Sequence, residues 1–480
     1  MLSLIDELLK EQFPQTIDGT DAASVFEDVI NPATGRPFHG APVATVDELE
    51  AALAAARRAQ PSWAARSWEE RAAALESFAK TIETNVERLA HLSTLEQGRP
   101  LAGARIELGL ACRYIRLLAA VRLPSRVLID NEVRRIVERW TPKGVVLAVA
   151  PWNAPVVLGM AKIATALIGG NTIVIKPSEL TPLCTLELGR LGRKVFPPGV
   201  LNVVSGGRAV GAALVELLGF DKISFTGSTA TGRSIAAKAG TLLRPVTLEL
   251  GGNDAAVLLP DGSIEAMTAA ATLTGLVNCG QFCGAVKRIY APRNLYEAVC
   301  ESLTERAKKI VIGDGLSPGV EMGPIQNKAQ FDKVCAIVDD ARAAGGRILT
   351  GGEPMASDGY FYPPTVVADL TNGVRLVDEE QFGPVIPIVA YDDLDHVIDI
   401  LNAGPYGLTS SIWTADLDHG AELASRLAVG TGLVNQHGGF DASVPMSLIK
   451  QSGIGVDYAE YGVKGAMNLQ VINVNKTVRH

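Results

Sequence analysis

Near its middle, the chain changes directly from a strand pattern to a helix pattern in Ile223-Ser224-Phe225-Thr226-Gly227-Ser228-Thr229-Ala230-Thr231-Gly232. Residues Lys222 to Thr226 predict a strand, and Arg233 to Ala239 predict a helix. A helix that opens after these glycines would point backbone N–H groups at a bound phosphate. The glycine spacing alone is a weak signal, and its place between a strand and a helix is what makes it informative.

The same alternation continues on both sides of this turn. It predicts strands at Gly144 to Ala150, Thr172 to Ile175 and Val200 to Val204, and helices at Ala154 to Ile168, Cys184 to Val195 and Ala209 to Leu218. Such alternation predicts an α/β fold with a parallel sheet, helices on both faces and ligands at the carboxyl ends of the strands. We expect a dinucleotide-binding domain, although the G-x-G-x-x-G fingerprint is absent and Gly206 to Gly211 is the other near match.

The rest of the chain divides into four further kinds of segment. From Gly251 to about Asn435 there is a second α/β alternation, and Thr45 to about Gln97 is helical, with a Ser67-x-x-Glu70 capping box. Residues 1 to 46 predict an irregular arm, in which the turn-rich Asn31 to Gly35 lies between extended pieces. Two isolated strand patterns, Val133 to Trp140 and Leu469 to Asn475, suggest strand pairing between subunits, or else each lies at the edge of its own domain's sheet.

Length and composition exclude several classes of protein. The 480 residues predict two or three domains. A net charge of -8, with 20% charged residues, argues against nucleic acid or an anionic membrane as the main partner. The N-terminus carries Asp6 and Glu7 and no basic region, so no secretory signal is expected. The apolar run Val156 to Ile175 contains Lys162, and we interpret it as a buried helix and a strand rather than a membrane span.

Six cysteines are spread along the chain, which does not resemble a disulfide framework and fits a reducing cytoplasm. Cys279 and Cys283 are four residues apart, but no second cysteine pair and no nearby histidine completes a metal-ligand set. We therefore expect a cytoplasmic protein without a metal site.

The turn-prone sequence Asn278-Cys279-Gly280-Gln281-Phe282-Cys283 ends in a thiol. Backbone N–H groups in such a turn can stabilise a thiolate, so Cys283 is a candidate nucleophile, although a lone cysteine is more often a small buried apolar residue. Upstream, Leu248-Glu249-Leu250-Gly251-Gly252-Asn253 places Glu249 in an apolar segment, where a raised carboxyl pKa and general-base work are plausible. A thiol nucleophile and a buried carboxylate are the two groups needed to form and then hydrolyse a thioester.

A third polar motif, Lys176-Pro177-Ser178-Glu179, follows a predicted strand. Lys176 and Glu179 could bind the hydroxyls of a ribose, and a carboxylate there would disfavour a 2′-phosphate, so NAD is expected over NADP. The alternative is a surface ion pair in a turn.

Taken together, these motifs resemble those of the aldehyde dehydrogenase superfamily over nearly the whole chain. The matching motifs in chain order are Asn31-Pro32-Ala33-Thr34-Gly35, Pro151-Trp152-Asn153-Ala154-Pro155, Lys176-Pro177-Ser178-Glu179, Phe225-Thr226-Gly227-Ser228, Leu248-Glu249-Leu250-Gly251-Gly252, Gly280-Gln281-x-Cys283, Glu380-x-Phe382-Gly383-Pro384 and Lys450-x-Ser452-Gly453-x-Gly455.

The resemblance implies an NAD(P)-dependent oxidation of an aldehyde to a carboxylic acid. It assigns Cys283 as the nucleophile, Glu249 as the general base and Asn153 as an oxyanion donor. For the cofactor it implies Lys176 and Glu179 on the adenosine ribose, Ser228 at the pyrophosphate, Glu380 on the nicotinamide ribose and Phe382 beside the nicotinamide. The remaining residues that it places at the cofactor are Trp152, Ser178, Gly211, Gly227 and Leu250.

The resemblance also implies a division of the chain. It predicts a Rossmann-type cofactor domain from residues 1–122 and 142–250, a catalytic α/β domain from 251–449, a return segment at 450–463, and oligomerisation strands at 123–141 and 464–480. A homodimer or a homotetramer is expected.

The chain departs from the family pattern where the substrate is expected. Many relatives have Phe-Gly-Gly after the residue that matches Pro445, and this chain has Met446-Ser447-Leu448. The residue after Asn153 is Ala154, where many relatives carry a bulky aromatic, and this suggests a wider entrance. With Phe282, Phe440 and Met446 as further pocket residues, we expect a medium or bulky apolar or aromatic aldehyde.

Two other functions stay open at the level of sequence. One is a CoA-acylating relative, in which CoA and not water resolves the thioester, and Glu249 argues against it. The other is a non-catalytic binding protein with the same fold, which has no chemical reason to retain Cys283, Glu249 and Asn153 together.

Overall fold

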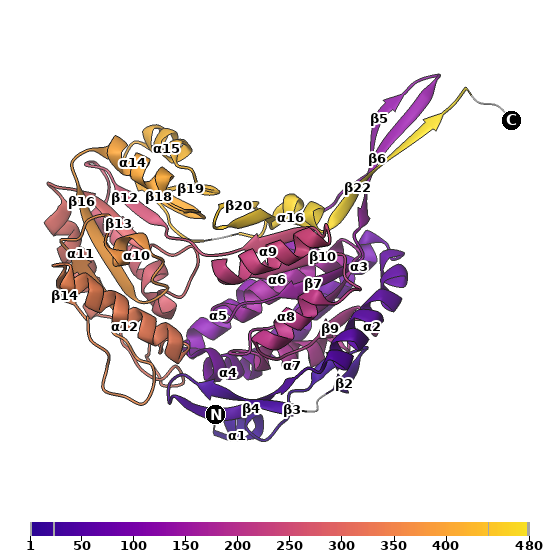
Figure 1. The fold of residues 1–480 in the computed structure, drawn as a ribbon, viewed down its shortest axis with the longest axis horizontal. Coiled ribbons are helices and arrows are strands. Elements are labelled where there is room, and N and C mark those ends of the chain that lie inside the picture. The colour runs from indigo at the N-terminus through magenta and orange to yellow at the C-terminus, as the bar shows by residue number, and fades with distance from the viewer. Residues whose placement is uncertain (1, 23–24, 440, 478–480) are drawn as a thin grey trace.

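The computed structural model describes residues 2–22, 25–439 and 441–477. Two α/β bodies lie beside one another, and a narrow three-stranded arm projects away from them (Figure 1). Each body is built on its own sheet, one of ten strands and one of seven.

The ten-stranded sheet has the strand order β17-β20-β21-β11-β10-β7-β8-β9-β1-β2. Its centre is parallel and consists of β7 (Val145–Val149), β8 (Thr172–Lys176), β9 (Leu201–Val203), β10 (Lys222–Thr226) and β11 (Val246–Glu249). These strands are almost entirely buried, which is why they appear in the sequence as continuous apolar runs. The predicted parallel sheet is confirmed.

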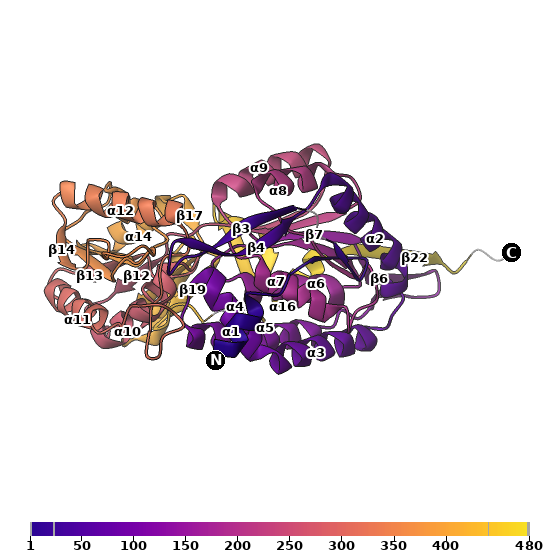
Figure 2. The same ribbon diagram turned by 90° about the horizontal axis from the view of Figure 1, so that it is seen from below.

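Helices cover both faces of this sheet (Figure 2). On one face, α6 (Pro155–Ile168) and α7 (Leu183–Gly192) pack with α3 (Trp68–Thr84), α4 (Val86–Gln97) and α5 (Leu101–Ala119) in one apolar core. On the other face, α2 (Val46–Ala64), α8 (Arg208–Glu216) and α9 (Thr229–Thr241) form a second core. The capping box at Ser67 and Glu70 is present, and Thr45 and Glu48 form another one at the start of α2.

The N-terminal segment is more regular than the irregular arm that the sequence predicts. It contains α1 (Leu2–Leu8), β1 (Gln15–Ile17), β2 (Thr20–Ala22) and a hairpin of β3 (Val25–Asn31) and β4 (Arg36–Val43). β1 pairs antiparallel with β9 and extends the main sheet. The extended pieces on either side of the turn at Asn31 to Gly35 are confirmed as β3 and β4. The strand β1 was not predicted, because it has three residues, too few to show a period, and two of them are the polar Gln15 and Thr16.

The seven-stranded sheet has the order β14-β15-β16-β13-β12-β18-β19. Its strands are β12 (Ala255–Leu258), β13 (Arg288–Pro292), β14 (Arg347–Thr350), β15 (Thr365–Ala368), β16 (Val385–Tyr391), β18 (Thr409–Trp413) and β19 (Thr431–Val434). One face packs against α10 (Ile264–Gly275) and α11 (Tyr296–Lys308). The other packs against α12 (Lys328–Ala343), α13 (Arg375–Asp378), α14 (Leu394–Ala403) and α15 (Leu417–Arg426). The second α/β unit is therefore confirmed.

The chain returns to the ten-stranded sheet earlier than expected. β20 (Met446–Lys450) and β21 (Gly453–Asp457) pair with each other, β21 pairs with β11, and β17 (Tyr406–Gly407) pairs with β20. The return therefore begins at Met446 and not at residue 450, because the edge of β11 is completed by a hairpin. The short helix α16 (Ala459–Gly465) follows.

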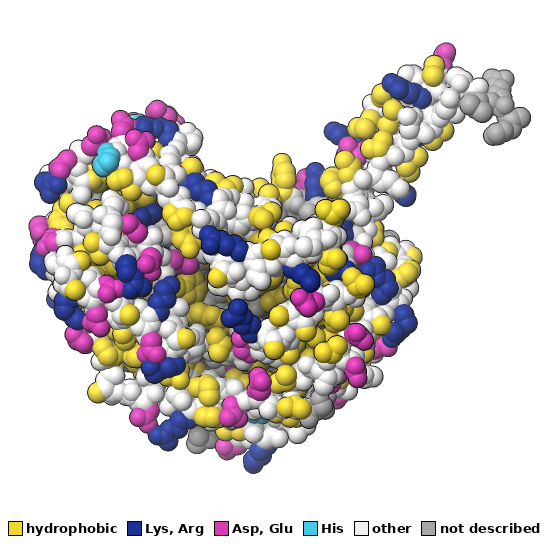
Figure 3. Space-filling model, viewed as in Figure 1, with side chains coloured by type: hydrophobic (Ala, Val, Ile, Leu, Met, Phe, Trp, Pro, Cys, Tyr) yellow, Lys and Arg dark blue, Asp and Glu magenta, His cyan; other side chains and the backbone are white. Residues whose placement is uncertain are grey.

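The two isolated strand patterns pair with each other. β22 (Met467–Asn475) runs antiparallel to β6 (Arg134–Pro142), which pairs with β5 (Arg126–Asp130) in a separate three-stranded sheet. Neither strand therefore lies at an edge of the ten-stranded or the seven-stranded sheet. Apolar side chains are visible along this arm in Figure 3. Val127, Leu469 and Val471, which belong to its strands, are exposed.

No helix in the described part of the chain is long and apolar enough to cross a membrane. The run Val156 to Ile175 forms α6 and β8, as the sequence predicted.

Candidate active site

The parallel strands bring the predicted site residues to one edge of the ten-stranded sheet. Trp152 and Asn153 follow β7, Lys176 ends β8, Gly227 follows β10, and Glu249 ends β11. Because β11, β10, β7 and β8 are neighbours and run in the same direction, their carboxyl ends meet.

The cysteine turn reaches this edge from the seven-stranded body. It begins in the 3-10 turn Val277–Gly280, where Asn278, Cys279 and Gly280 all have left-handed φ angles of 54°, 56° and 62°. Such a conformation costs about 1–3 kcal/mol for a residue other than glycine, so contacts must hold it. Lys287 donates to the Gly280 carbonyl at 3.0 Å, and the Asn278 amide donates to the Asn153 carbonyl at 3.2 Å.

Cys283 and Glu249 meet beyond this turn. Burial raises the pKa of the Glu249 carboxyl to about 8. Cys283 and Lys162 act in the opposite direction and keep the pKa from rising further. Burial, and then the Glu249 charge, raise the pKa of the Cys283 thiol well above its ordinary value. The two groups are close enough to shift each other's pKa, although neither Glu249 oxygen makes a regular hydrogen bond within the described residues. This pair can exchange a proton, with Glu249 buried and Cys283 half-buried.

The Asn153 side chain lies against the same turn. Its Nδ2 donates to the main-chain carbonyl of Gln281 at 3.0 Å, and the residue is buried. The structure thus brings Asn153, Cys283 and Glu249 together from three distant parts of the sequence.

A small cavity of about 20 Å³, lined by both polar and apolar residues, lies between β10 and α6. Since one water needs at least 10–15 Å³ of such volume, it has room for about one water. Lys162 lines it and donates to Ser224 Oγ at 3.1 Å, and burial lowers the pKa of this lysine. The sequence showed Lys162 as a charge within an apolar helix, but not its partner.

The residues predicted at the adenosine end lie in one region. Lys176 is buried, donates from Nζ to the Pro177 carbonyl at 2.8 Å and lies 3.8 Å from the half-exposed Glu179 carboxyl. Ser178 Oγ accepts from the N–H of Leu180 at 3.3 Å. A Cβ at Gly211 would contact the Lys176 side chain at 3.6 Å, so α8 approaches this lysine closely.

The start of α9 is open to a ligand. Ser228 is exposed and is the N-cap residue of α9, where its Oγ accepts from the N–H of Thr231 at 3.2 Å. Leu250 packs so tightly on Gly232 that a Cβ there would lie 2.4 Å from its side chain. The predicted strand, turn and helix are therefore present, and the anion site at the start of α9 stays a prediction.

Glu380, Phe382 and Trp152 gather nearer to Cys283. Glu380 Oε1 accepts from the N–H of Gly252 at 3.1 Å, and burial raises its pKa. The Trp152 and Phe382 rings make an edge contact with centroids 5.4 Å apart, and Lys287 Nζ lies 4.7 Å from the Phe382 ring centre.

The structure describes three of the four residues that were predicted to line the substrate pocket. Ala154 and Phe282 are half-buried and Met446 is buried in β20, while Phe440 lies outside the described residues.

Two tyrosines that the sequence did not single out also lie near Cys283. The rings of Tyr114 and Tyr458 are 5.3 Å apart. Burial raises the pKa of both phenols, and the charge of Cys283 makes a smaller contribution in the same direction. Tyr458 has a φ of 64°, which is rare for a bulky residue. No local motif marks either residue, because they come from α5 and from the turn after β21.

All six cysteines are free thiols. Cys279 is buried and donates to the Gly323 carbonyl at 3.0 Å. Within the described ranges, no group of three or more His, Cys, Asp and Glu side chains could hold a metal ion.

The comparison with known proteins agrees with this geometry. The family model described as "Aldehyde dehydrogenase family" matches residues 20–472. The chain belongs to the aldehyde dehydrogenase family. Among the curated relatives of the enzyme, an aldehyde dehydrogenase of Fusarium sp. is 36% identical over 442 residues, which cover 92% of this chain and 93% of that protein. A betaine aldehyde dehydrogenase of Cereibacter sphaeroides is 37% identical over 445 residues, 91% of each protein.

Solved structures of the family have the same fold. The NAD+ complex of an aldehyde dehydrogenase from Bacillus cereus superposes with a TM-score of 0.95 at 33% identity and covers 98% of each chain. The resemblance inferred from the sequence is thus confirmed, together with the α/β fold. The enzyme is an oxidoreductase of the class that oxidises aldehydes with NAD(P).

Proposed function

We propose that the enzyme oxidises an aldehyde to a carboxylic acid through a thioester on Cys283, which water hydrolyses with Glu249 as general base. The meeting of Cys283, Glu249 and Asn153 at one sheet edge carries this proposal.

In the first step, the Cys283 sulfur attacks the aldehyde carbon. The thiol proton passes to the Glu249 carboxylate as the S–C bond forms, because burial holds the pKa of the thiol high. The aldehyde oxygen becomes an oxyanion, for which the second amide hydrogen of Asn153 and the backbone N–H of Cys283 are the donors. Each donor of this kind typically contributes about 10²–10³ in rate.

The residues of the cofactor region fit NAD. Ser228 and the start of α9 suit a pyrophosphate, Lys176 and Glu179 suit the adenosine ribose, and Glu380 suits the second ribose. When bound, NAD supplies a hydride acceptor, and loss of a hydride from the thiohemiacetal carbon leaves a thioester on Cys283. The Glu179 carboxylate would repel a 2′-phosphate, so we expect NAD to be preferred over NADP.

Hydrolysis then uses Glu249 as a base. Glu249 first releases to solvent the proton that it took from Cys283. Its carboxylate then removes a proton from water, the hydroxide adds to the thioester carbonyl, and the Cys283 thiolate leaves and takes this proton back from Glu249. The products are the carboxylic acid and the free enzyme.

We infer that the substrate is a medium or bulky apolar or aromatic aldehyde. Ala154 leaves space beside Asn153, and Met446, Phe282, Tyr114 and Tyr458 offer apolar and aromatic surface. The name of the Cereibacter relative supplies a rival, betaine aldehyde, whose quaternary ammonium would also favour aromatic faces. A panel that prefers betaine aldehyde, acetaldehyde or a charged semialdehyde contradicts our inference.

We further propose that the ten-stranded body binds the cofactor, the seven-stranded body contributes the nucleophile, and the projecting arm pairs with another copy of the chain in a dimer or tetramer. The six free thiols support a reducing compartment such as the cytoplasm.

The test is NADH formation by the purified enzyme with benzaldehyde, phenylacetaldehyde, hexanal, acetaldehyde and betaine aldehyde, beside Cys283→Ala and Glu249→Gln. We expect steady turnover without CoA in the wild type, no NADH from Cys283→Ala, and at most a single burst from Glu249→Gln. Strict dependence on CoA would instead support the acyl-transferring alternative. Cofactor binding without any turnover would support a binding protein.

A further inference from the structure

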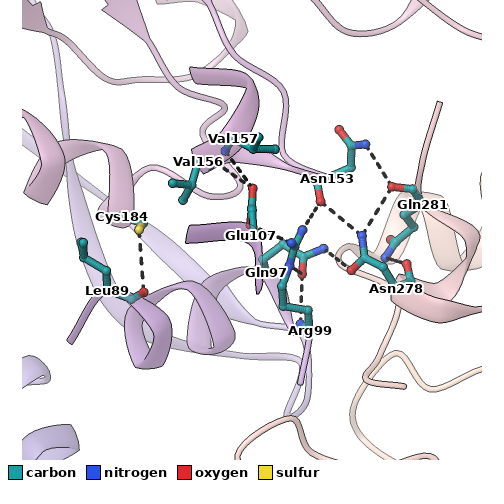
Figure 4. A network of polar contacts seen from close by, with 10 residues as sticks. All are labelled: Leu89, Gln97, Arg99, Glu107, Asn153, Val156, Val157, Cys184, Asn278 and Gln281. Carbon is teal, nitrogen blue, oxygen red and sulfur yellow. Dashed lines mark hydrogen bonds and ion pairs between the residues drawn. The ribbon is translucent and has the colours of Figure 1, made fainter. Parts of the chain in front are cut away.

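A buried ion pair lies behind the loop that carries Asn153 (Figure 4). Arg99, in the turn between α4 and α5, places Nη1 2.7 Å from Glu107 Oε2, and both side chains are less than a tenth exposed. A buried pair of this kind is weak evidence for stability alone, because desolvation offsets much of the attraction. The other contacts of Arg99 and Glu107 show which loops of the site this ion pair holds in place.

Arg99 uses the rest of its guanidinium on the two catalytic loops. Its Nη2 donates to the main-chain carbonyl of Asn153. Its Nε donates to Gln97 Oε1 at 2.9 Å, and Gln97 Nε2 in turn donates to Asn278 Oδ1 at 3.2 Å. One planar group is therefore connected to the oxyanion loop directly and to the cysteine turn through Gln97.

Glu107 acts on the other side of Asn153. Its Oε1 accepts from the backbone N–H groups of Val156 and Val157 at 3.0 and 3.1 Å, in the first turn of α6. Ala154, the N-cap residue of α6, has no side chain that could accept these bonds. Glu107 therefore caps α6 from a neighbouring helix and fixes where that helix begins, directly after Asn153.

The Asn153 backbone is thus held from both ends. Arg99 and Asn278 bind its carbonyl, and Glu107 fixes the helix that follows. Since misplacement of a catalytic group by about 1 Å can cost about 10²-fold in rate, this support matters to an oxyanion donor.

We propose that Arg99 and Glu107 are positioning residues that set the place of the Asn153 amide relative to Cys283. Neither touches the reacting atoms, so their effect on the proposed reaction passes through Asn153. This inference rests on the proposed function.

Arg99→Lys is the informative change. A lysine keeps the positive charge opposite Glu107, but it cannot make this ion pair and also donate to both Gln97 and the Asn153 carbonyl from one planar group. We expect the rate of the first-turnover NADH burst to fall about 10–100-fold, with the NAD dissociation constant and the melting temperature little changed.

A double-mutant cycle separates positioning from general damage. If Arg99 acts through the Asn153 amide, then Arg99→Lys will slow the burst less than about 2-fold in an Asn153→Ala background. Rate losses that multiply in the double variant, or a wild-type burst rate in Arg99→Lys, overturn the inference.

Two further variants keep the test decisive. Arg88→Lys is the matched control, because Arg88 also pairs with a buried glutamate, Glu187, at 3.0 Å in the same body, and it should keep the wild-type burst. If Arg99→Lys does not fold, Glu107→Gln serves instead, since it keeps an acceptor for α6 and loses the charge. We expect its burst to fall about 3–10-fold, again only when Asn153 is present, and an unchanged burst overturns the inference.

The failure of this inference can be told apart from failure of the proposed function. If the wild type gives no NADH burst with any aldehyde of the panel, the proposed function fails. If the wild type gives an NADH burst but the rate losses of Arg99→Lys and Asn153→Ala multiply in the double variant, only the positioning role fails.

Discussion

The carboxyl group of Glu249 is buried at the end of β11, and burial raises its pKa to about 8. In the proposed hydrolysis Glu249 is the base, and a base works only when it is deprotonated, so we expect this shift to set the pH at which hydrolysis becomes fast. The thiol of Cys283 and the ammonium of Lys162 both oppose the shift, and these three groups control the proton balance of the site.

From this shift we expect the rate of thioester hydrolysis to rise with pH and to level off above about 8, because the fraction of Glu249 carboxylate grows through that range. The measurement is the single-turnover hydrolysis rate from about pH 6 to 9.5. Glu249→Gln should be slow and should lack this transition. A wild-type rate that stays flat from about pH 6 to 9.5, as expected for a glutamate with the ordinary pKa of about 4.3, would contradict the role of burial.

At the residue scale, site residues could be predicted from the sequence only where they belong to short motifs. Cys283 and Glu249 could be proposed from local patterns, and Asn153 from the resemblance of its motif. Arg99, Glu107 and Tyr458 could not, because their roles arise from contacts between segments far apart in the chain.

At the scale of elements, the turn before Cys283 is the feature under most strain. Gly280 has a φ of 62°, and a Cβ there would lie 2.3 Å from the Gly383 carbonyl oxygen. A side chain at this position would need both a left-handed backbone and a shift of the neighbouring loop. Glycine is therefore required to bring Cys283 to the sheet edge.

We expect Gly280→Ala to lower the free energy of unfolding by about 2–4 kcal/mol and to remove most activity, because the turn must move. Thermal denaturation and the NADH burst measure the two effects. Gly109→Ala in α5 is the control, since a Cβ there meets nothing within 4 Å and the change should be neutral or slightly stabilising. A Gly280→Ala enzyme as stable and active as the control would refute this view of the turn.

The elements themselves could be predicted where burial is uniform. The strands β7, β8 and β10 lie within one residue of their predicted ends, because central parallel strands are apolar throughout. β1 was missed because pairing with β9, and not its own residues, makes it a strand. The early return at Met446 was missed for a related reason, since β20 and β21 are held by β11.

At the scale of the whole molecule, no other part of the chain that the structure describes covers the projecting arm. β22 is exposed along nearly its whole length, with Val471 at 54% and Leu469 at 53%. An exposed apolar strand pair is unfavourable in water unless another surface covers it. We therefore expect the arm to be buried between subunits.

Val471→Asp should convert the proposed oligomer largely to monomer, because a buried charge without a partner opposes association. Sedimentation velocity gives the mass, and circular dichroism checks the fold. Leu273→Asp is the control, since Leu273 is 67% exposed on α10, away from the arm, and the variant should stay associated. A monomeric wild type, or an unchanged Val471→Asp oligomer, would contradict the assignment.

The most direct measurement of the central claim is the mass of the Glu249→Gln enzyme after mixing with NAD and the preferred aldehyde. We expect a stable mass increase equal to the acyl group, located by peptide mapping on Cys283 and absent in Cys283→Ala with Glu249→Gln. NADH formation with no acyl group on the protein, or an acyl group on Cys279 instead, would contradict the thioester on Cys283.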